Sequence, residues 1–325
     1  MMDAHVEADL RNSYGISFDK CAPVTGGWLN LKWKVTTDRG EFLVKQFSGE
    51  RFDKKHLLFI EAALERQMAL NADGVPCPAI LPCGGRAIRF LDGGTAYMVM
   101  EFCPGHVERP ETITRAQMES LGDAAGKMRG AFARLPAESA AGFPLRGEET
   151  LDALWKNFET KARECPENAP AGYRAAVLAL EPVLNALTPA WFARLPKGIA
   201  HEDFSRDNML FEDDRLSAIL DFDRGLYTYV WHDLGRALLS LAFREGRLDI
   251  PKIDAFRAGY NRHLPLSRED VADAFRLAWC VETPWWILPQ FFGDCREEKV
   301  TRFRDEMLWL TENWFDLDAM LRSNE

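Results

Sequence analysis

The sequence lacks the features that mark secreted, membrane-spanning and zinc-binding proteins. Its 7 cysteines contain no CxxC pair and its 6 histidines are widely spread, whereas a structural zinc site needs closely spaced ligands. An odd number of cysteines in a long chain favours reduced thiols. No stretch approaches the roughly 20 apolar residues of a bilayer span, and the acidic start does not resemble a signal peptide. We therefore expect a cytoplasmic protein with no membrane partner and no structural metal.

The sequence also has no excess of basic residues over acidic ones. The 50 acidic residues outnumber the 40 lysines and arginines, for a formal net charge of -10, so the chain offers no basic field to a phosphate backbone. We expect no nucleic-acid partner. Hydrophobic residues make up 47% and charged residues 28%, which indicates a folded globular protein rather than a disordered or coiled-coil one. A chain of 325 residues suits two domains or two lobes.

Apolar patterns and turn signals in the first hundred residues predict a small antiparallel sheet with one main helix. Residues 31–35 and 41–47 flank a turn cluster and predict a hairpin. Apolar residues at spacings of three and four predict a helix over 54–71. Residues 86–91 and 95–102 flank Asp-Gly-Gly and predict a second hairpin.

The sequence beyond Pro104 is typical of a helical region with one short β-like island. Helical patterns cover 115–134 and 173–187, and the island covers 198–223. We therefore predict an α+β protein.

The most unusual polar residues lie inside this island. The apolar runs 209–211 and 218–220 predict a hairpin, which brings Asn208 and Asp221 to the same end. Amide and carboxylate oxygens are ligands that suit Mg²⁺. Asp203, on the loop leading in, could reach a substrate hydroxyl beside a metal-bound phosphate. The alternative is an ordinary acidic loop, since Asp and Asn are common in turns.

The pattern His-x-Asp-x-x-x-x-Asn, followed by an apolar strand and Asp-Phe, resembles the catalytic segment of the aminoglycoside phosphotransferase and choline kinase superfamily. The resemblance covers nearly the whole chain and implies a protein-kinase-like fold of two lobes. Residues 1–103 would form a small antiparallel-sheet lobe that binds nucleotide, and residues 104–325 a larger helical lobe with the catalytic loop and the acceptor site. Residues 206–211 are similar to bacterial homoserine kinases. Residues 221–223, with Tyr227, Tyr229 and Asp233, are similar to choline kinases.

This resemblance implies a phosphotransferase that uses ATP and Mg²⁺. Asp203 would orient the acceptor hydroxyl and take its proton, while Asn208 and Asp221 would hold Mg²⁺. His201 would orient the catalytic loop through a hydrogen bond, and Asp233 would cap the following helix and support the loop.

In the first lobe, the resemblance points to a strand lysine and its partner. Lys45 would grip the α- and β-phosphates, and strand alternation puts it on the opposite face from Val44. Glu61 on the next helix would pair with Lys45, and Glu65, one turn later, is the alternative.

The remaining nucleotide contacts follow from the same resemblance. Gly26 and Gly27 would lie in the loop that covers the phosphates, although a plain hairpin needs the same glycines. The backbones of Glu101 and Cys103 would hold adenine between the lobes. No GxxxxGK[ST] motif occurs, so the motif evidence excludes a P-loop kinase.

The acceptor is expected to be a small molecule with a hydroxyl group. A hydroxylated amine such as homoserine, choline or an aminoglycoside suits the helical lobe, where late tryptophans alternate with acids. An amino acid also needs a cation for its carboxylate, for which Arg224 and Arg262 are candidates. The acids could equally be solvated helix faces, and the sequence indicates no oligomeric state. The acids in question are Glu282, Asp294, Glu297, Glu298, Asp305 and Glu306.

Two other functions fit parts of the sequence. A pseudokinase would hold nucleotide as a scaffold, although no Asp, Asn or Lys of the expected catalytic set is missing. His232 and Asp233, with His201 upstream, form a literal His-Asp pair like that of HD-type metal phosphohydrolases. That fold is all-helical, which does not fit the strand-rich first hundred residues.

Overall fold

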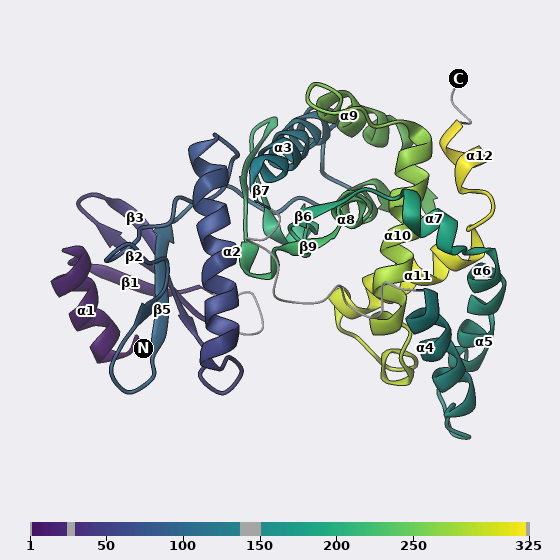
Figure 1. The fold of residues 1–325 in the computed structure, drawn as a ribbon, viewed down its shortest axis with the longest axis horizontal. Helices are drawn as coiled ribbons and strands as arrows, with labels where there is room; N and C mark the ends of the chain where they lie inside the picture. The colour runs from purple at the N-terminus through teal and green to yellow at the C-terminus, as the bar shows by residue number, and fades with distance from the viewer. Residues whose placement is uncertain (1, 25–29, 137–150, 323–325) are drawn as a thin grey trace.

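The computed structural model describes residues 2–24, 30–136 and 151–322. A small lobe built on a sheet lies beside a larger, mainly helical lobe, and helix α2 (Lys54–Ala72) lies at the boundary between them (Figure 1). This arrangement agrees with the predicted α+β class.

The small lobe is a five-stranded antiparallel sheet in the order β1-β2-β3-β5-β4. The strands β2 and β3 form the first predicted hairpin, and β4 and β5 form the second. Because β3 is the central strand, Lys45 lies in register between Lys32 and Met98. The strands are β1 Lys20–Pro23, β2 Leu31–Thr37, β3 Gly40–Phe47, β4 Arg89–Phe90 and β5 Ala96–Glu101.

Two helices cover opposite faces of this sheet. Helix α1 (Ala4–Tyr14), which no sequence pattern indicated, packs Leu10 in one apolar cluster with Val44. Helix α2 packs against the other face, in a cluster that includes Met98. Successive strand residues point to opposite faces, so Lys45 shares the α2 face with its neighbour Met98, as alternation predicts.

The larger lobe packs long helices around one apolar core. Helix α3 (Arg115–Arg134) has the predicted bounds and lies against α9 (Ile250–Tyr260). Helices α8 (Trp231–Ala242) and α10 (Arg268–Trp286) pack together inside the lobe. The other helices are α4 Leu151–Arg163, α5 Tyr173–Leu178, α6 Leu180–Ala186, α7 Pro189–Arg194, α11 Glu298–Glu312 and α12 Leu317–Arg322.

The single helix predicted over 173–187 is wrong. Two short helices, α5 and α6, replace it and meet at Ala179. Pro182 has no N–H to donate to the carbonyl of Leu178, four residues earlier, so the helical hydrogen-bond ladder is interrupted there.

The predicted β-like island forms two strand pairs. Strands β7 (Met209–Glu212) and β8 (Arg215–Ile219) form the expected antiparallel hairpin. Strand β6 (Lys197–Ala200) pairs with β9 (Leu226–Tyr229), a pairing that no sequence pattern indicated. The predicted catalytic loop, residues 201–208, therefore runs from β6 to β7.

The link between the lobes is fixed against this hairpin. Ser217 Oγ donates to the Pro104 carbonyl at 2.8 Å, and His106 exchanges backbone hydrogen bonds with Phe211. Gly105 has a φ of 119, and a Cβ atom there would lie 2.6 Å from Ser217 Oγ and 2.9 Å from the Phe211 carbonyl oxygen. Only glycine fits this position without displacing its neighbours.

The core of the large lobe extends into the first hundred residues. Leu70, at the end of α2, joins Val75 and Cys77 in the apolar cluster of the large lobe. The N–H of Ile219 in β8 also donates to the Pro76 carbonyl at 2.8 Å. Residues 1–103 thus supply part of the core of the large lobe, and the division into 1–103 and 104–325 stays a prediction.

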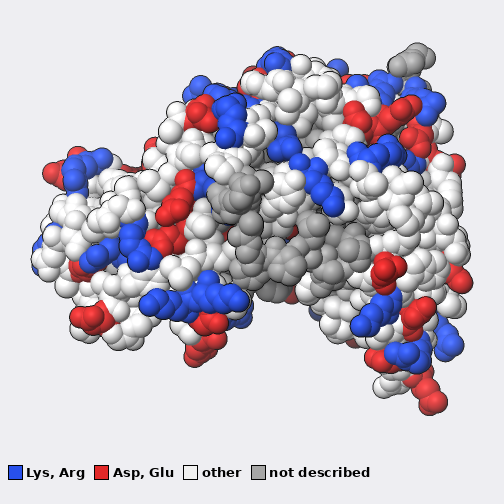
Figure 2. Space-filling model, in the orientation of Figure 1, with Lys and Arg blue, Asp and Glu red and all other residues white. Residues whose placement is uncertain are grey.

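Charges of both signs are interspersed over the visible face of the molecule (Figure 2). Within the described ranges, no helix combines the length and the apolar character that crossing a membrane requires.

Candidate active site

His201 and Asp233 hold the backbone of the catalytic loop. The Asp233 carboxylate accepts the N–H groups of His201 and Glu202 at 2.7 and 2.9 Å. His201 Nδ1 accepts the N–H of Asp203 at 3.2 Å, so Nε2 carries the proton and donates to the Leu220 carbonyl at 2.9 Å. These contacts agree with the loop-orienting role of His201. Helix α8 has no side-chain N-cap, so the capping role expected of Asp233 is wrong.

Asn208 and Asp221 lie at the same end of the β7–β8 hairpin, as its pairing predicts. The N–H of Leu220 donates to the Asn208 carbonyl at 2.9 Å. Asn208 Nδ2 donates to the backbone carbonyl of Asp203 at 2.8 Å, which leaves its Oδ1 as the atom for a metal ion. An amide oxygen beside carboxylates fits the ligand preference of Mg²⁺.

Lys45 contacts two carboxylates of the other lobe. Its Nζ lies 2.7 Å from Asp221 Oδ1 and 2.6 Å from Asp223 Oδ2, and the lysine is buried. Asp223, whose role the sequence left open, therefore lies in the same group of charges as Lys45 and Asp221.

The expected pairing of Lys45 with Glu61 is wrong. Glu61 is buried, and its carboxylate accepts from the Arg86 guanidinium and from the N–H of Ile88, with 3.0 Å between Arg86 Nε and Glu61 Oε1. Glu65, the alternative, is exposed. Glu61 thus holds the segment before β4 against α2, and no pattern in the sequence identified Arg86 as its partner.

The charges around Lys45 shift one another's ionisation. Burial alone would lower the pKa of Lys45, but the carboxylates of Asp221 and Asp223 outweigh burial and raise it. The Lys45 charge holds the pKa of Asp221 well below its usual range. Burial raises the pKa of Asp223 despite the nearby lysine. The three groups therefore behave as one linked set.

Glu101 and Cys103 lie where the sheet passes into the link between the lobes. Glu101 is the last residue of β5, and its N–H donates to the Ala79 carbonyl at 2.8 Å. Burial raises the pKa of the Cys103 thiol to about 12, so the thiol stays protonated. Adenine binding by these backbones stays a prediction. Gly26 and Gly27 lie outside the described residues.

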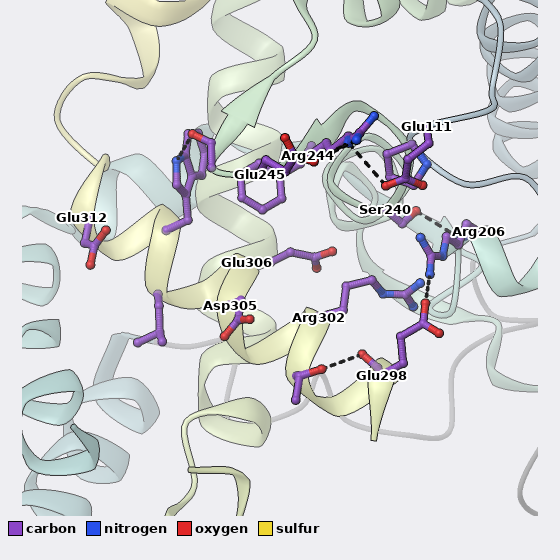
Figure 3. A pocket seen from close by; sticks show the side chains of 16 residues that line it. Glu111, Arg206, Ser240, Arg244, Glu245, Glu298, Arg302, Asp305, Glu306 and Glu312 are labelled. Atoms are coloured by element: carbon purple, nitrogen blue, oxygen red, sulfur yellow. Dashed lines mark hydrogen bonds and ion pairs between the residues drawn. The ribbon is translucent and has the colours of Figure 1, made fainter. Parts of the chain in front are cut away.

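A pocket of about 500 Å³ lies between the catalytic loop and α11 (Figure 3). Arg206 enters it from the loop and contacts Glu298 at 3.0 Å. Arg302 enters from α11 and contacts Asp207 at 2.8 Å. Glu306 faces the same pocket. The predicted catalytic and metal-binding residues do not line it.

Several groups expected to bind the acceptor are already paired. Glu282 and Glu306 are buried, and both contact Arg236. Arg262 contacts Glu119 on α3. Neither buried glutamate is free to receive an acceptor amine, and the expectation that Glu282 and Glu306 do so is wrong.

Residues 20–279 match the phosphotransferase enzyme family. A homoserine kinase of Allorhizobium ampelinum is 28% identical over 252 residues, which cover 77% of this chain and 73% of that protein. A homoserine kinase of Rhodospirillum rubrum is 28% identical over 261 residues, which cover 78% of this chain and 74% of that protein.

Solved kinase structures share the fold. An amicoumacin kinase bound to AMP-PNP and Ca²⁺ has a TM-score of 0.67 at 13% identity, over 98% of this chain and 95% of that chain. A microcompartment-associated aminopropanol kinase has a TM-score of 0.66 at 16% identity, over 98% of this chain and 99% of that chain. These similarities confirm the predicted kinase-like fold.

The family match runs from β1 into α10 and includes the strand that carries Lys45, the catalytic loop and the β7–β8 hairpin. The chain therefore belongs to the phosphotransferase enzyme family and is a small-molecule kinase.

Proposed function

We propose that this kinase uses Mg²⁺ to transfer the γ-phosphate of ATP to a hydroxyl group of a small hydroxylated amine. Homoserine is the first choice, and choline-like and aminoglycoside-like amines belong to the same class. The contact of Lys45 with Asp221, at 2.7 Å, carries the proposal, because it joins a strand cation of one lobe to a carboxylate beside the catalytic loop of the other.

Each residue of this group has a part in phosphoryl transfer. Asp203 would orient the acceptor hydroxyl and accept its proton. Lys45 would bind the α- and β-phosphates. Asn208 and Asp221 would hold Mg²⁺, which, when bound, supplies positive charge to the phosphate oxygens. Glu61 has no direct role in this proposal, because it pairs with Arg86.

The acceptor class rests on the relatives and on exposed groups of the large lobe. The relatives that are named homoserine kinase support an amino alcohol, and residues 206–211 carry that likeness. Trp285 is 50% exposed, and an aromatic face suits an ammonium group. Arg224, next to Asp223, is exposed, and a guanidinium suits a carboxylate.

A panel of acceptors tests this function. The purified protein is incubated with ATP and Mg²⁺, and ADP and the phosphorylated product are measured for homoserine, choline, ethanolamine, an aminoglycoside and glycerol. We expect acceptor-dependent ADP release with an amino alcohol and none with glycerol. Phosphorylation of neutral polyols alone would rule out the amine class and retain the kinase.

The same panel tests the pseudokinase, whereas the geometry bears on the hydrolase. A pseudokinase would show ATP-dependent thermal stabilisation without turnover of any acceptor. An HD-type hydrolase is disfavoured by geometry, because Asp233 binds the loop backbone and His232 lies between Glu202 and Glu282.

A further inference from the structure

A chain of buried charges begins next to the catalytic aspartate candidate. Glu202 Oε1 lies 3.4 Å from His232 Nδ1, and His232 Nε2 lies 3.3 Å from Glu282 Oε1. Glu282 Oε2 accepts from Arg236 Nη1 at 2.7 Å. Arg236 Nη2 contacts Glu306. The chain thus joins the catalytic loop to α8, α10 and α11.

All five members of this chain are buried, and none is more than 6% exposed. A buried charge is stable only when it is paired. Burial alone would lower the pKa of His232, but Glu202 and Glu282 outweigh it and raise the pKa to about 10. The imidazole is therefore a cation between two carboxylates at neutral pH.

The backbone of Glu202 has a conformation that side chains rarely adopt. Its φ is 68, in the left-handed region, where a residue other than glycine is strained. The Asp233 carboxylate accepts the N–H groups of His201 and Glu202. The buried carboxylate of Glu202 itself faces His232. Asp203 follows directly, so the direction of its side chain depends on how Glu202 is held.

We propose that Glu202 is a positioning residue, and that its contact with His232 fixes the backbone of the catalytic loop from which Asp203 acts. The phosphotransfer role of Asp203 belongs to the proposed function, on which this inference partly rests. The fixing of the loop does not depend on it.

Glu306 provides a matched control, because it lies in the same buried chain at the far end from the loop. Glu202→Gln and Glu306→Gln each replace one buried carboxylate by an amide of the same size. We expect hydrogen exchange of the amides in residues 201–208 to become at least tenfold faster in Glu202→Gln and to stay within twofold of the wild type in Glu306→Gln. Equal acceleration in both variants, or none in Glu202→Gln, would overturn the proposal.

His232→Gln tests the same contact from the other side. We expect it to accelerate exchange as Glu202→Gln does. The double variant should exchange little faster than either single variant, because both changes remove the same interaction. Effects that multiply in the double variant would count against a coupled pair. If Glu202→Gln does not fold, the comparison of Glu202→Asp with His232→Gln decides: exchange close to the wild type in Glu202→Asp alone supports the pair, and equal exchange in the two variants overturns it.

Kinetics give a second readout. With an acceptor that the wild type uses, we expect kcat of Glu202→Gln to fall roughly tenfold while KM for ATP stays within twofold, because the loop and not the nucleotide site is affected. A wild type that phosphorylates no acceptor would refute the proposed function, and the exchange experiment would still decide the positioning role.

Discussion

Lys45 and Asp221 are 176 positions apart in the chain, and Lys45 Nζ lies 2.7 Å from Asp221 Oδ1. The lysine belongs to the sheet of the small lobe and the aspartate follows the hairpin of the large lobe. Removing the aspartate would leave a buried lysine with one carboxylate fewer, which is costly. The ion pair therefore links the position of β3 to that of the catalytic loop.

Asp203→Asn should lower kcat by roughly 10²–10⁴, the scale of a positioned base, and leave ATP binding within a few-fold. Steady-state kinetics and calorimetry measure the two effects. Asp214→Asn is the control, because Asp214 lies exposed in the β7–β8 turn. Turnover of Asp203→Asn within tenfold of the wild type would remove Asp203 from its proposed role.

Asp221→Ala should weaken Mg²⁺-dependent ATP binding more than Asn208→Ala does. A carboxylate supplies charge to the ion and also pairs with Lys45, whereas an amide supplies only a neutral oxygen. We expect roughly a tenfold or larger loss for Asp221→Ala. Calorimetry with ATP, with and without Mg²⁺, measures it, and equal losses in the two variants would contradict the assignment.

Gly105→Ala should destabilise the protein more than Gly40→Ala. The two glycines have similar φ values, 119 and 122, so the backbone strain is matched, but only Gly105 has neighbours within 3 Å of the added Cβ. We expect an additional loss of about 1–3 kcal/mol for Gly105→Ala. Urea unfolding of both variants measures the difference, and equal stabilities would show that the link tolerates a side chain.

His232 should make stability fall as the pH rises. Its folded pKa of about 10 lies above the unfolded value of about 6.5, so its contribution is complete below about pH 6.5 and is lost as the pH rises toward 10. The difference in Tm between the wild type and His232→Gln should shrink over that range. A difference that does not change with pH would show that His232 is neutral in the folded protein.

Lys161 should make the stability of the protein rise as the pH rises. It is buried, donates to the carbonyls of Thr283 and Pro284, and burial lowers its pKa to about 7, below the unfolded value of about 10.4. The unfolded chain then binds more protons between these pH values, so the wild type should gain stability over Lys161→Met as the pH rises from about 7 to about 10. A fall in that difference would contradict the assignment.

Local patterns predicted the parts of the fold that depend on neighbouring residues. The β7–β8 hairpin follows from two apolar runs around a polar turn, and it was sufficient to bring Asn208 and Asp221 together. The alternation of β3 was sufficient to put Lys45 on the opposite face from Val44. Helix α1 was missed because Val6 and Leu10 are its only buried residues, and two apolar positions make no clear period.

Contacts between distant segments were not predictable in the same way. The position of Glu61 on α2 follows from helical spacing, but its partner Arg86 comes from an irregular segment whose path no pattern determines. The burial of His232 and Arg236 depends on how α10 and α11 pack around α8. The sequence alone therefore could not show that Glu282 and Glu306 are buried and paired.

The apolar contacts of Leu70, Val75 and Cys77 with the large lobe affect how this protein can be recombined with its relatives. A chimera that exchanges the first 103 residues would also exchange these three side chains and would place foreign volumes in the core around α3. A crossover before Leu70, within α2, keeps that core from a single parent but divides the small sheet between β3 and β5. A hybrid joined at the link between the lobes should therefore fold more often when Leu70, Val75 and Cys77 are matched to the parent that supplies the large lobe.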